Sequence, residues 1–131
     1  MIKNGLIKGL QHIGIPTDKI DLSVNFYKSL GFHLIMETIN EETNEKVVFL
    51  ELNALVLELY ESKKNALMDG AINHIALDVD SIGVLYESII KVGYEVVTDG
   101  IQFLPFGNKG ILFFIINGPN CEKIEFCKKI K

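Results

Sequence analysis

Four side chains that could bind one divalent metal lie at matched positions in two halves of the sequence: His12, Glu58, His74 and Glu125. Each histidine stands in a short apolar stretch rich in β-forming residues, and each glutamate stands in a later stretch of the same kind. Imidazole nitrogens and carboxylate oxygens together suit Ni, Co, Mn, Fe or Zn, with water filling the remaining positions. The sequence therefore predicts a divalent-metal site without choosing among these metals.

The four residues belong to an internal repeat. At an offset of 62 residues, His12 aligns with His74 and Gly31 with Gly93 without a gap. The two glutamates lie 67 residues apart, so the second half carries about five extra residues before its last strand. Insertions of this size belong in loops, and the Gly-rich segment 103–110 is the natural place for this one.

The elements that must position these residues follow in the same order in each half. The first half is predicted to contain a strand at 9–16, a helix from the N-cap Asp18 to Leu30, and strands at 32–40, 46–53 and 54–60. The second half is predicted to contain a strand at 72–79, a helix from the cap Ser81 to Val92, and strands near 94–101, 110–117 and 122–128. We therefore expect one α+β domain, residues 1–131, made of two tandem βαβββ modules at 8–61 and 71–128.

Strand periodicity places the four candidate ligands on one kind of face. Residues i and i+2 of a strand share a face, so His12 lies beside Gly14, and His74 lies beside Ala76. The bulky apolar residues of these strands lie on the other face, which suits packing beneath the amphipathic helices. Small residues beside the histidines leave room for a ligand on a curved sheet. The alternative is that these polar residues face only water, and their duplication favours the metal site.

Two further residues have expected positions. Cys127 follows Glu125 by two residues and should share its face. His33 lies outside the repeat pattern and is expected at the surface.

Composition limits the function classes. The chain has 131 residues, 48% of them hydrophobic, a formal net charge of -4, and basic residues that are all lysine. The negative charge argues against a nucleic-acid partner, and no apolar run is long enough to span a membrane. No signal-peptide core is present, and the only cysteines are Cys121 and Cys127. A cytoplasmic protein with free thiols and a small-molecule substrate is expected.

The chain resembles the vicinal oxygen chelate superfamily, also called the glyoxalase, bleomycin-resistance and dioxygenase superfamily, over residues 8–128. The segments that carry the resemblance are 11–14, 26–32, 56–59, 73–77 and 118–126. In that family two βαβββ modules form a cupped, mostly antiparallel sheet with helices on its outer face, around a divalent metal that binds two adjacent oxygens of a substrate. The resemblance implies His12, Glu58, His74 and Glu125 as metal ligands, and it implies a homodimer.

The full set of two histidines and two glutamates is most similar to glyoxalase I-like members. These lactoylglutathione lyase-like enzymes isomerise the adduct of a 2-oxoaldehyde and a thiol through an enediolate. The resemblance implies that Glu125 transfers the proton and that Glu58 is a ligand that could share this role. The alternatives are a methylmalonyl-CoA epimerase-like enzyme, a dioxygenase with two histidines and one carboxylate, and a metal-free small-molecule binding or resistance protein. The lack of arginine argues against glutathione as the thiol.

Overall fold

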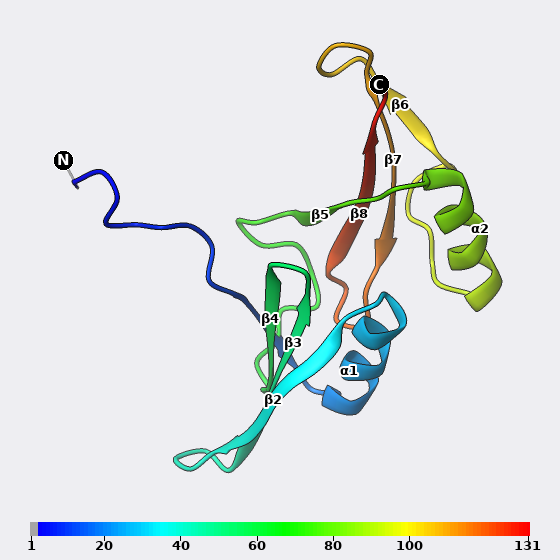
Figure 1. The fold of residues 1–131 in the computed structure, drawn as a ribbon. Coiled ribbons are helices and arrows are strands. Elements are labelled where there is room, and N and C mark those ends of the chain that lie inside the picture. The colour runs from blue at the N-terminus through cyan, green and yellow to red at the C-terminus, as the bar shows by residue number, and fades with distance from the viewer. Residues whose placement is uncertain (1–2) are drawn as a thin grey trace. The chain divides into compact units, whose positions relative to one another are not determined.

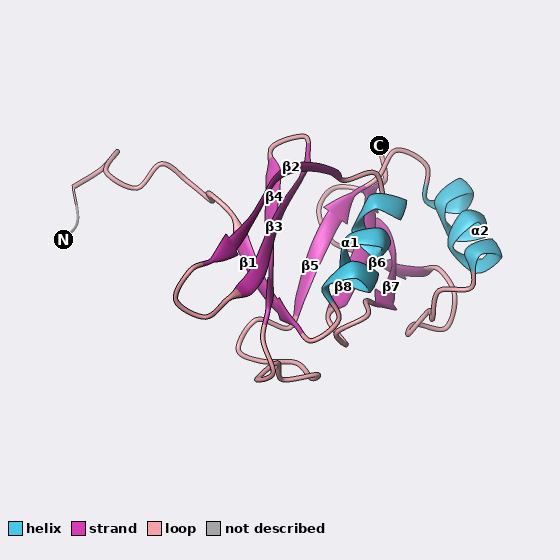
Figure 2. Ribbon diagram, turned by 90° about the horizontal axis from the view of Figure 1, so that it is seen from below, coloured by secondary structure: helices cyan, strands magenta, loops and turns pink. Residues whose placement is uncertain are grey.

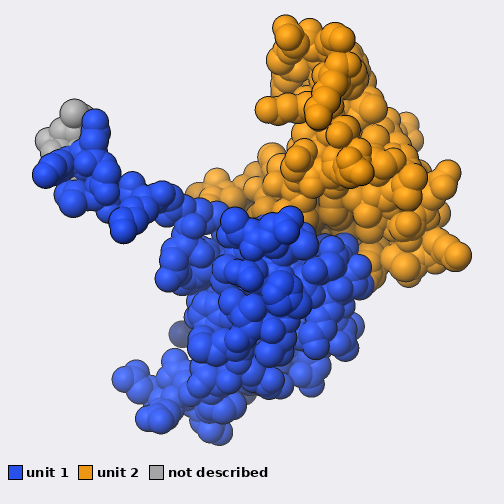
Figure 3. Space-filling view, in the orientation of Figure 1, with its two compact units in different colours: residues 1–65 blue, residues 66–131 orange. Residues whose placement is uncertain are grey.

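The computed structural model describes residues 3–131 and divides into two compact units, one ending at Asn65 and the other beginning at Ala66 (Figure 3). Each unit contains a strand, a helix and three further strands, in that order (Figure 2). The predicted α+β fold with two βαβββ modules is confirmed. Within the described part of the chain, neither helix has the length and apolarity needed to cross a membrane.

The first unit forms an open four-stranded sheet (Figure 1). Its elements are β1 (Ile13–Thr17), α1 (Ile20–Ser29), β2 (His33–Asn40), β3 (Glu45–Leu52) and β4 (Leu55–Glu61). The strand order is β1-β4-β3-β2, with β1 parallel to β4 and the other pairs antiparallel. The first and last strands of the module are therefore neighbours.

The second unit has the same topology. Its elements are β5 (His74–Asp78), α2 (Ile82–Val92), β6 (Gln102–Leu104), β7 (Ile111–Asn117) and β8 (Lys123–Lys129). The strand order is β5-β8-β7-β6, with β5 parallel to β8. The predicted sheet is thus present as two open sheets, one in each module.

One face of each sheet is packed beneath its helix. In the first unit α1 contacts β2, β3 and β4, and the strand residues Leu50, Leu57 and Leu59 are fully buried. In the second unit α2 contacts β7 and β8, where Phe114 and Ile124 are equally buried. Burying such a side chain contributes about 1.5–3 kcal/mol, so this packing fixes which face of each strand points away from the helix.

The predicted N-cap of the first helix is wrong. The N-cap position is Lys19, and its side chain makes no capping hydrogen bond. The Asp18 carboxylate instead accepts a hydrogen bond from the Lys19 ammonium at 2.9 Å. The buried Thr17 hydroxyl accepts the Lys19 backbone N–H at 3.1 Å and lies 2.9 Å from the Ser23 hydroxyl. The side chain that accepts a backbone N–H at the start of α1 is therefore that of Thr17 and not that of Asp18.

The strand predicted near 94–101 is also wrong. This segment makes only an isolated bridge, Val96 to Ile116, and the edge strand β6 begins at Gln102. The Thr98 hydroxyl accepts the backbone N–H of Ile115 at 3.2 Å, and Gly100 has φ +67°. The Thr98 hydroxyl oxygen therefore takes the place of the backbone carbonyl that would accept this hydrogen bond in a regular strand. The chain then turns before β6 begins.

Candidate metal centre

The first unit brings His12 to Glu58. His12 directly precedes β1, and Glu58 lies in β4 opposite Gly14. The Nε2 atom of His12 and the Oε1 atom of Glu58 are 3.6 Å apart, and both side chains are partly exposed. A Cβ atom on Gly14 would lie 3.5 Å from that carboxylate oxygen, so the missing side chain leaves space beside Glu58.

The second unit makes the same pair from His74 and Glu125. His74 begins β5, and Glu125 lies in β8 opposite Ala76. The His74 Nε2 atom and the Glu125 Oε1 atom are 3.6 Å apart. The Glu125 side chain is 15% exposed, against 28% for Glu58, so the two carboxylates differ in their contact with water.

Both histidines contact an amide oxygen of the preceding residue through Nδ1. His12 bonds to the Gln11 amide oxygen, and His74 bonds to the Asn73 amide oxygen at 2.9 Å. Because an amide oxygen only accepts, each Nδ1 donates a hydrogen to it, and in the neutral imidazole each Nε2 then directs its lone pair toward the glutamate. In that neutral form two acceptors face each other and repel, and a cation between them, either a metal ion or a proton on Nε2, removes the repulsion.

The spacing also fits a metal ion. Zinc binds imidazole nitrogen and carboxylate oxygen at about 2.0–2.2 Å, which places two ligand atoms about 3.4 Å apart in tetrahedral geometry. The observed 3.6 Å is close to this value in both units. Among residues 3–131, neither unit by itself gathers three His, Cys, Asp or Glu side chains into such a group. Each unit thus supplies one pair of the candidate ligands, and the first unit has a second pair at the same distance, His33 and Glu51.

Sequence reasoning found the four candidate ligands but not the role of the residues before the histidines. The available signal was an amide side chain, Gln11 or Asn73, directly before each histidine of the repeat. Such hydrogen bonds to the second imidazole nitrogen orient metal-binding histidines in many proteins.

The expected positions of two other residues are confirmed. Cys127 lies on the Glu125 face, and burial together with the negative charge of Glu125 and Asp78 raises the pKa of its thiol. His33 is an exposed residue at the start of β2, paired across the ladder with Glu51, and its Nε2 lies 3.6 Å from a Glu51 carboxylate oxygen. The second half has Glu95 at the position corresponding to His33, so this pair is not duplicated.

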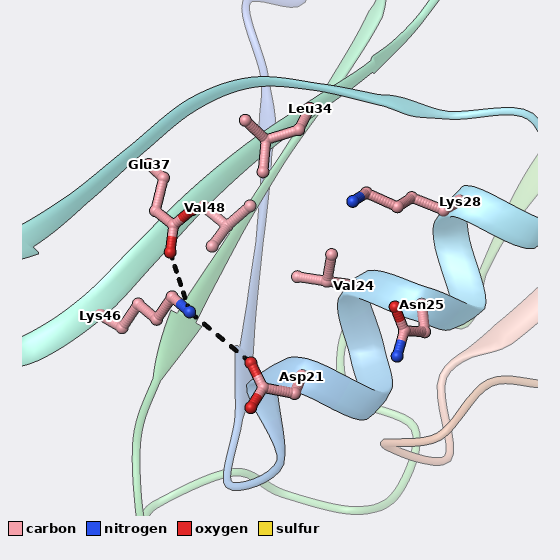
Figure 4. Close-up of a pocket in the computed structure, with 8 residues that line it drawn as sticks. All are labelled: Asp21, Val24, Asn25, Lys28, Leu34, Glu37, Lys46 and Val48. Atoms are coloured by element: carbon pink, nitrogen blue, oxygen red, sulfur yellow. Dashed lines mark ion pairs between the residues drawn. The ribbon is translucent and has the colours of Figure 1, made fainter.

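A separate pocket of about 260 Å³ lies between α1 and the strands β2 and β3 (Figure 4). The Lys46 ammonium in this pocket lies 2.8 Å from the Glu37 carboxylate and 3.6 Å from the Asp21 carboxylate. The hydrogen bond that the Lys46 ammonium donates to the Glu37 carboxylate raises the pKa of Lys46. Val48, which also lines the pocket, is buried on the helix-facing side of the sheet, so the pocket does not include the candidate metal ligands.

A sequence profile of the Glyoxalase/Bleomycin resistance protein/Dioxygenase superfamily matches residues 9–113. The chain belongs to this superfamily. The matched range includes three of the four candidate ligands and most of both modules. A comparison with curated proteins found no significant match.

Solved structures of superfamily members and other proteins share the fold. A glyoxalase family protein from Enterococcus faecalis is 21% identical, with a TM-score of 0.77 over 92% of this chain and 97% of that one. The fosfomycin resistance protein FosX from Listeria monocytogenes, solved with Mn(II) and sulfate, is 16% identical, with a TM-score of 0.75 over 95% of each chain. Virulence protein STM3117 from Salmonella typhimurium is 19% identical, with a TM-score of 0.70 over 95% of this chain and 99% of that one.

Proposed function

We propose that this superfamily member is a divalent-metal-dependent, glyoxalase I-like lyase or isomerase that acts on the adduct of a small 2-oxoaldehyde and a thiol. The supporting observation is the duplicated pair of histidine and glutamate. Each pair has the same 3.6 Å spacing, and each histidine has the same Nδ1 contact with an amide oxygen. The exposed pair of His33 and Glu51 has the same spacing, so the proposal depends on the duplication of the pair together with its Nδ1 contact rather than on the distance alone.

In this proposal His12, Glu58, His74 and Glu125 together hold one ion. Their nitrogen and oxygen donors suit Mn, Fe, Co, Ni or Zn, and the fold is shared with a protein solved with Mn(II). When bound, the ion supplies a Lewis acid that polarises a substrate carbonyl.

Glu125 is the proposed proton carrier. It removes the proton from the carbon bonded to sulfur and hydroxyl and returns it to the neighbouring carbonyl carbon, while the hydroxyl proton passes to the oxygen of that neighbouring carbon, so that the hemithioacetal becomes a 2-hydroxyacyl thioester through an enediolate. No other atom is gained or lost. Glu125 suits this role because it is the less exposed of the two carboxylates, and the neighbouring Cys127 covers part of the same face.

The proposal is tested with protein stripped by a chelator and reloaded separately with Mn(II), Co(II), Ni(II) or Zn(II). Methylglyoxal is supplied with glutathione and with smaller thiols, and thioester formation is followed by absorbance. We expect turnover with at least one metal and one thiol, and loss of turnover in Glu125→Gln. His33→Ala is the matched control, because it removes a histidine from the unduplicated pair and should leave turnover unchanged.

Metal binding is measured separately from turnover. Loss of the metal in both His74→Ala and Glu58→Ala supports four ligands, whereas loss only in His74→Ala indicates a three-ligand centre. A metal-loaded protein that is inactive with every thiol contradicts the glyoxalase-like activity. An intact protein that binds none of the four metals contradicts the centre itself.

We further propose that the protein is a homodimer. Co-expression of His12→Ala and His74→Ala chains tests whether each centre draws its modules from two chains. Mixed dimers then contain one intact centre, and about half the activity per dimer returns. Absence of any recovery in purified mixed dimers indicates that both modules of one chain form the centre.

A further inference from the structure

A network of polar contacts reaches the Nδ1 side of the His74 imidazole, opposite the Nε2 atom that faces Glu125. The Asn73 amide oxygen accepts the Nδ1–H of His74, and the Asn73 amide nitrogen donates to an Asp69 carboxylate oxygen at 3.0 Å. The same oxygen of Asp69 accepts a hydrogen bond from the Lys123 ammonium at 2.6 Å. The chain of contacts therefore runs from Lys123 through Asp69 and Asn73 to the imidazole.

The pairing of β5 with β8 places this network next to the candidate metal pair. Lys123 lies in β8 and is the ladder partner of His74 in β5. Glu125 follows Lys123 by two residues, on the same face of β8. The Lys123 side chain is 29% exposed and the Asp69 side chain 34%, so this ion pair is partly shielded from water. One end of the network thus lies in β8, the strand that carries Glu125, and the other end lies in the neighbouring strand β5.

The first unit cannot make an equivalent network. At the offsets of the repeat, Ile7 stands where the second half has Asp69, and Val56 stands where it has Lys123. Gln11 contacts His12 in the same way that Asn73 contacts His74, but neither isoleucine nor valine can extend that contact to a charge. The two modules therefore differ in the support given to the histidine, although the pairs themselves match.

The chemistry of the network predicts a stronger metal ligand. Asp69 draws the Asn73 amide into one orientation, with its nitrogen toward the carboxylate and its oxygen toward the imidazole. In the neutral imidazole, that orientation holds the hydrogen on Nδ1 and leaves the Nε2 lone pair directed at Glu125. Hydrogen bonds of this kind to the distal nitrogen of a ligating histidine raise its basicity and reduce the reorganisation needed when a metal binds.

We propose that Asp69, held by Lys123 and acting through Asn73, is a positioning residue that fixes the tautomer and orientation of His74 and makes the second-unit pair the stronger half of the metal centre. This inference rests on the proposed function, since it concerns the affinity of the same centre. It adds an asymmetry between the modules that the duplicated ligands alone do not predict.

The test compares Asp69→Asn, Asn73→Ala and Lys123→Met with wild-type full-length protein, using Co(II) and Zn(II) titrations. We expect the dissociation constant to rise about 10- to 100-fold in Asp69→Asn and Asn73→Ala. Asp99→Asn is the matched control, because it removes the same charge from an exposed position of the same unit and should change affinity less than twofold. Far-UV circular dichroism checks that each variant is folded, and Lys123→Met removes the ion pair without altering Asp69.

The second readout requires no metal. In chelator-treated protein, the ¹⁵N chemical shifts of the three histidine side chains report which nitrogen carries the hydrogen. We expect the Nδ1–H tautomer at His74 in the wild type and a shift toward Nε2–H in Asn73→Ala and Asp69→Asn.

The outcomes separate the two proposals. If wild-type protein binds metal and His74→Ala does not, yet Asp69→Asn and Lys123→Met bind as tightly as wild type, the positioning role is wrong and the metal centre stands. If wild-type protein binds no metal, the proposed function fails, and the tautomer measurement alone decides the inference. An unchanged His74 tautomer in both Asp69→Asn and Asn73→Ala overturns it.

Discussion

Two adjacent residues of β4 should affect different properties of the protein. Replacing Leu57 should mainly lower the free energy of unfolding, and replacing Glu58 should mainly lower the affinity for metal. Leu57 is fully buried beneath α1, whereas Glu58 points to the other face and is partly exposed. Leu57→Ala removes three carbon groups worth about 0.8 kcal/mol each and leaves a cavity, so we expect the free energy of unfolding to fall by about 3–4 kcal/mol. Glu58→Gln keeps the shape of the side chain and should cost less than about 0.5 kcal/mol in metal-free protein.

The measurement is urea unfolding in the presence of a chelator, followed by circular dichroism. For a slope of about 2 kcal/mol per molar urea, Leu57→Ala should lower the midpoint by about 1.5–2 M, while Glu58→Gln leaves it nearly unchanged. Ile124→Ala is the corresponding change in the second unit, because Ile124 is buried and directly precedes Glu125. Its cost should fall in the same range.

Metal titration of the folded variants should give the reverse order, with the larger loss of affinity in Glu58→Gln. The face assignment is refuted if Leu57→Ala costs less than about 1 kcal/mol, or if Glu58→Gln destabilises the metal-free protein as much as Leu57→Ala does. Either result would mean that the alternation along β4 does not separate the core from the candidate metal site.

Two further variants test local features of the second unit. In chelator-treated protein at pH 8, iodoacetamide should alkylate the exposed Cys121 before Cys127, because burial and then the charge of Glu125 raise the pKa of the Cys127 thiol and reduce its thiolate fraction. Glu125→Gln should speed the reaction at Cys127, and equal rates at the two wild-type cysteines, measured by mass spectrometry, would contradict this expectation. Gly110→Ala should lower the free energy of unfolding by at least about 1–2 kcal/mol, because Gly110 has φ +94° and an added Cβ would lie 2.9 Å from the Leu104 carbonyl oxygen. An unchanged urea midpoint would show that this turn tolerates a side chain.

The module plan could be predicted from sequence because its signals are local and occur twice. Gly31 and Gly93 mark equivalent helix ends, and both have positive φ in the structure. The alternation around Glu58 and Glu125 correctly separated the buried face of each strand from its less buried face. A single copy of either pattern would have been ambiguous, and the fixed offset resolved it.

The features that were missed depend on contacts that periodicity does not encode. The turn before β6 depends on the Thr98 hydroxyl replacing a backbone acceptor, which no apolar pattern records. The network behind His74 joins Asp69 to Lys123, 54 residues away, and a salt bridge over that separation has no local sequence signal. Only the amide residues before the histidines were within reach of sequence reasoning.

The parallel pairing of the first and last strands in each module has a consequence for how the proposed metal centre would form. His12 and Glu58 are 46 residues apart, and they meet only when β1 docks beside β4, after the intervening chain has folded back. Contacts between such distant parts of a chain form late, because closing the long loop costs entropy before any contact repays it. An unfolded or half-folded module therefore has no assembled donor pair to offer. In the proposed four-ligand centre, capture of the metal would mark the completion of folding in both modules, and it would stabilise only chains that have reached that point.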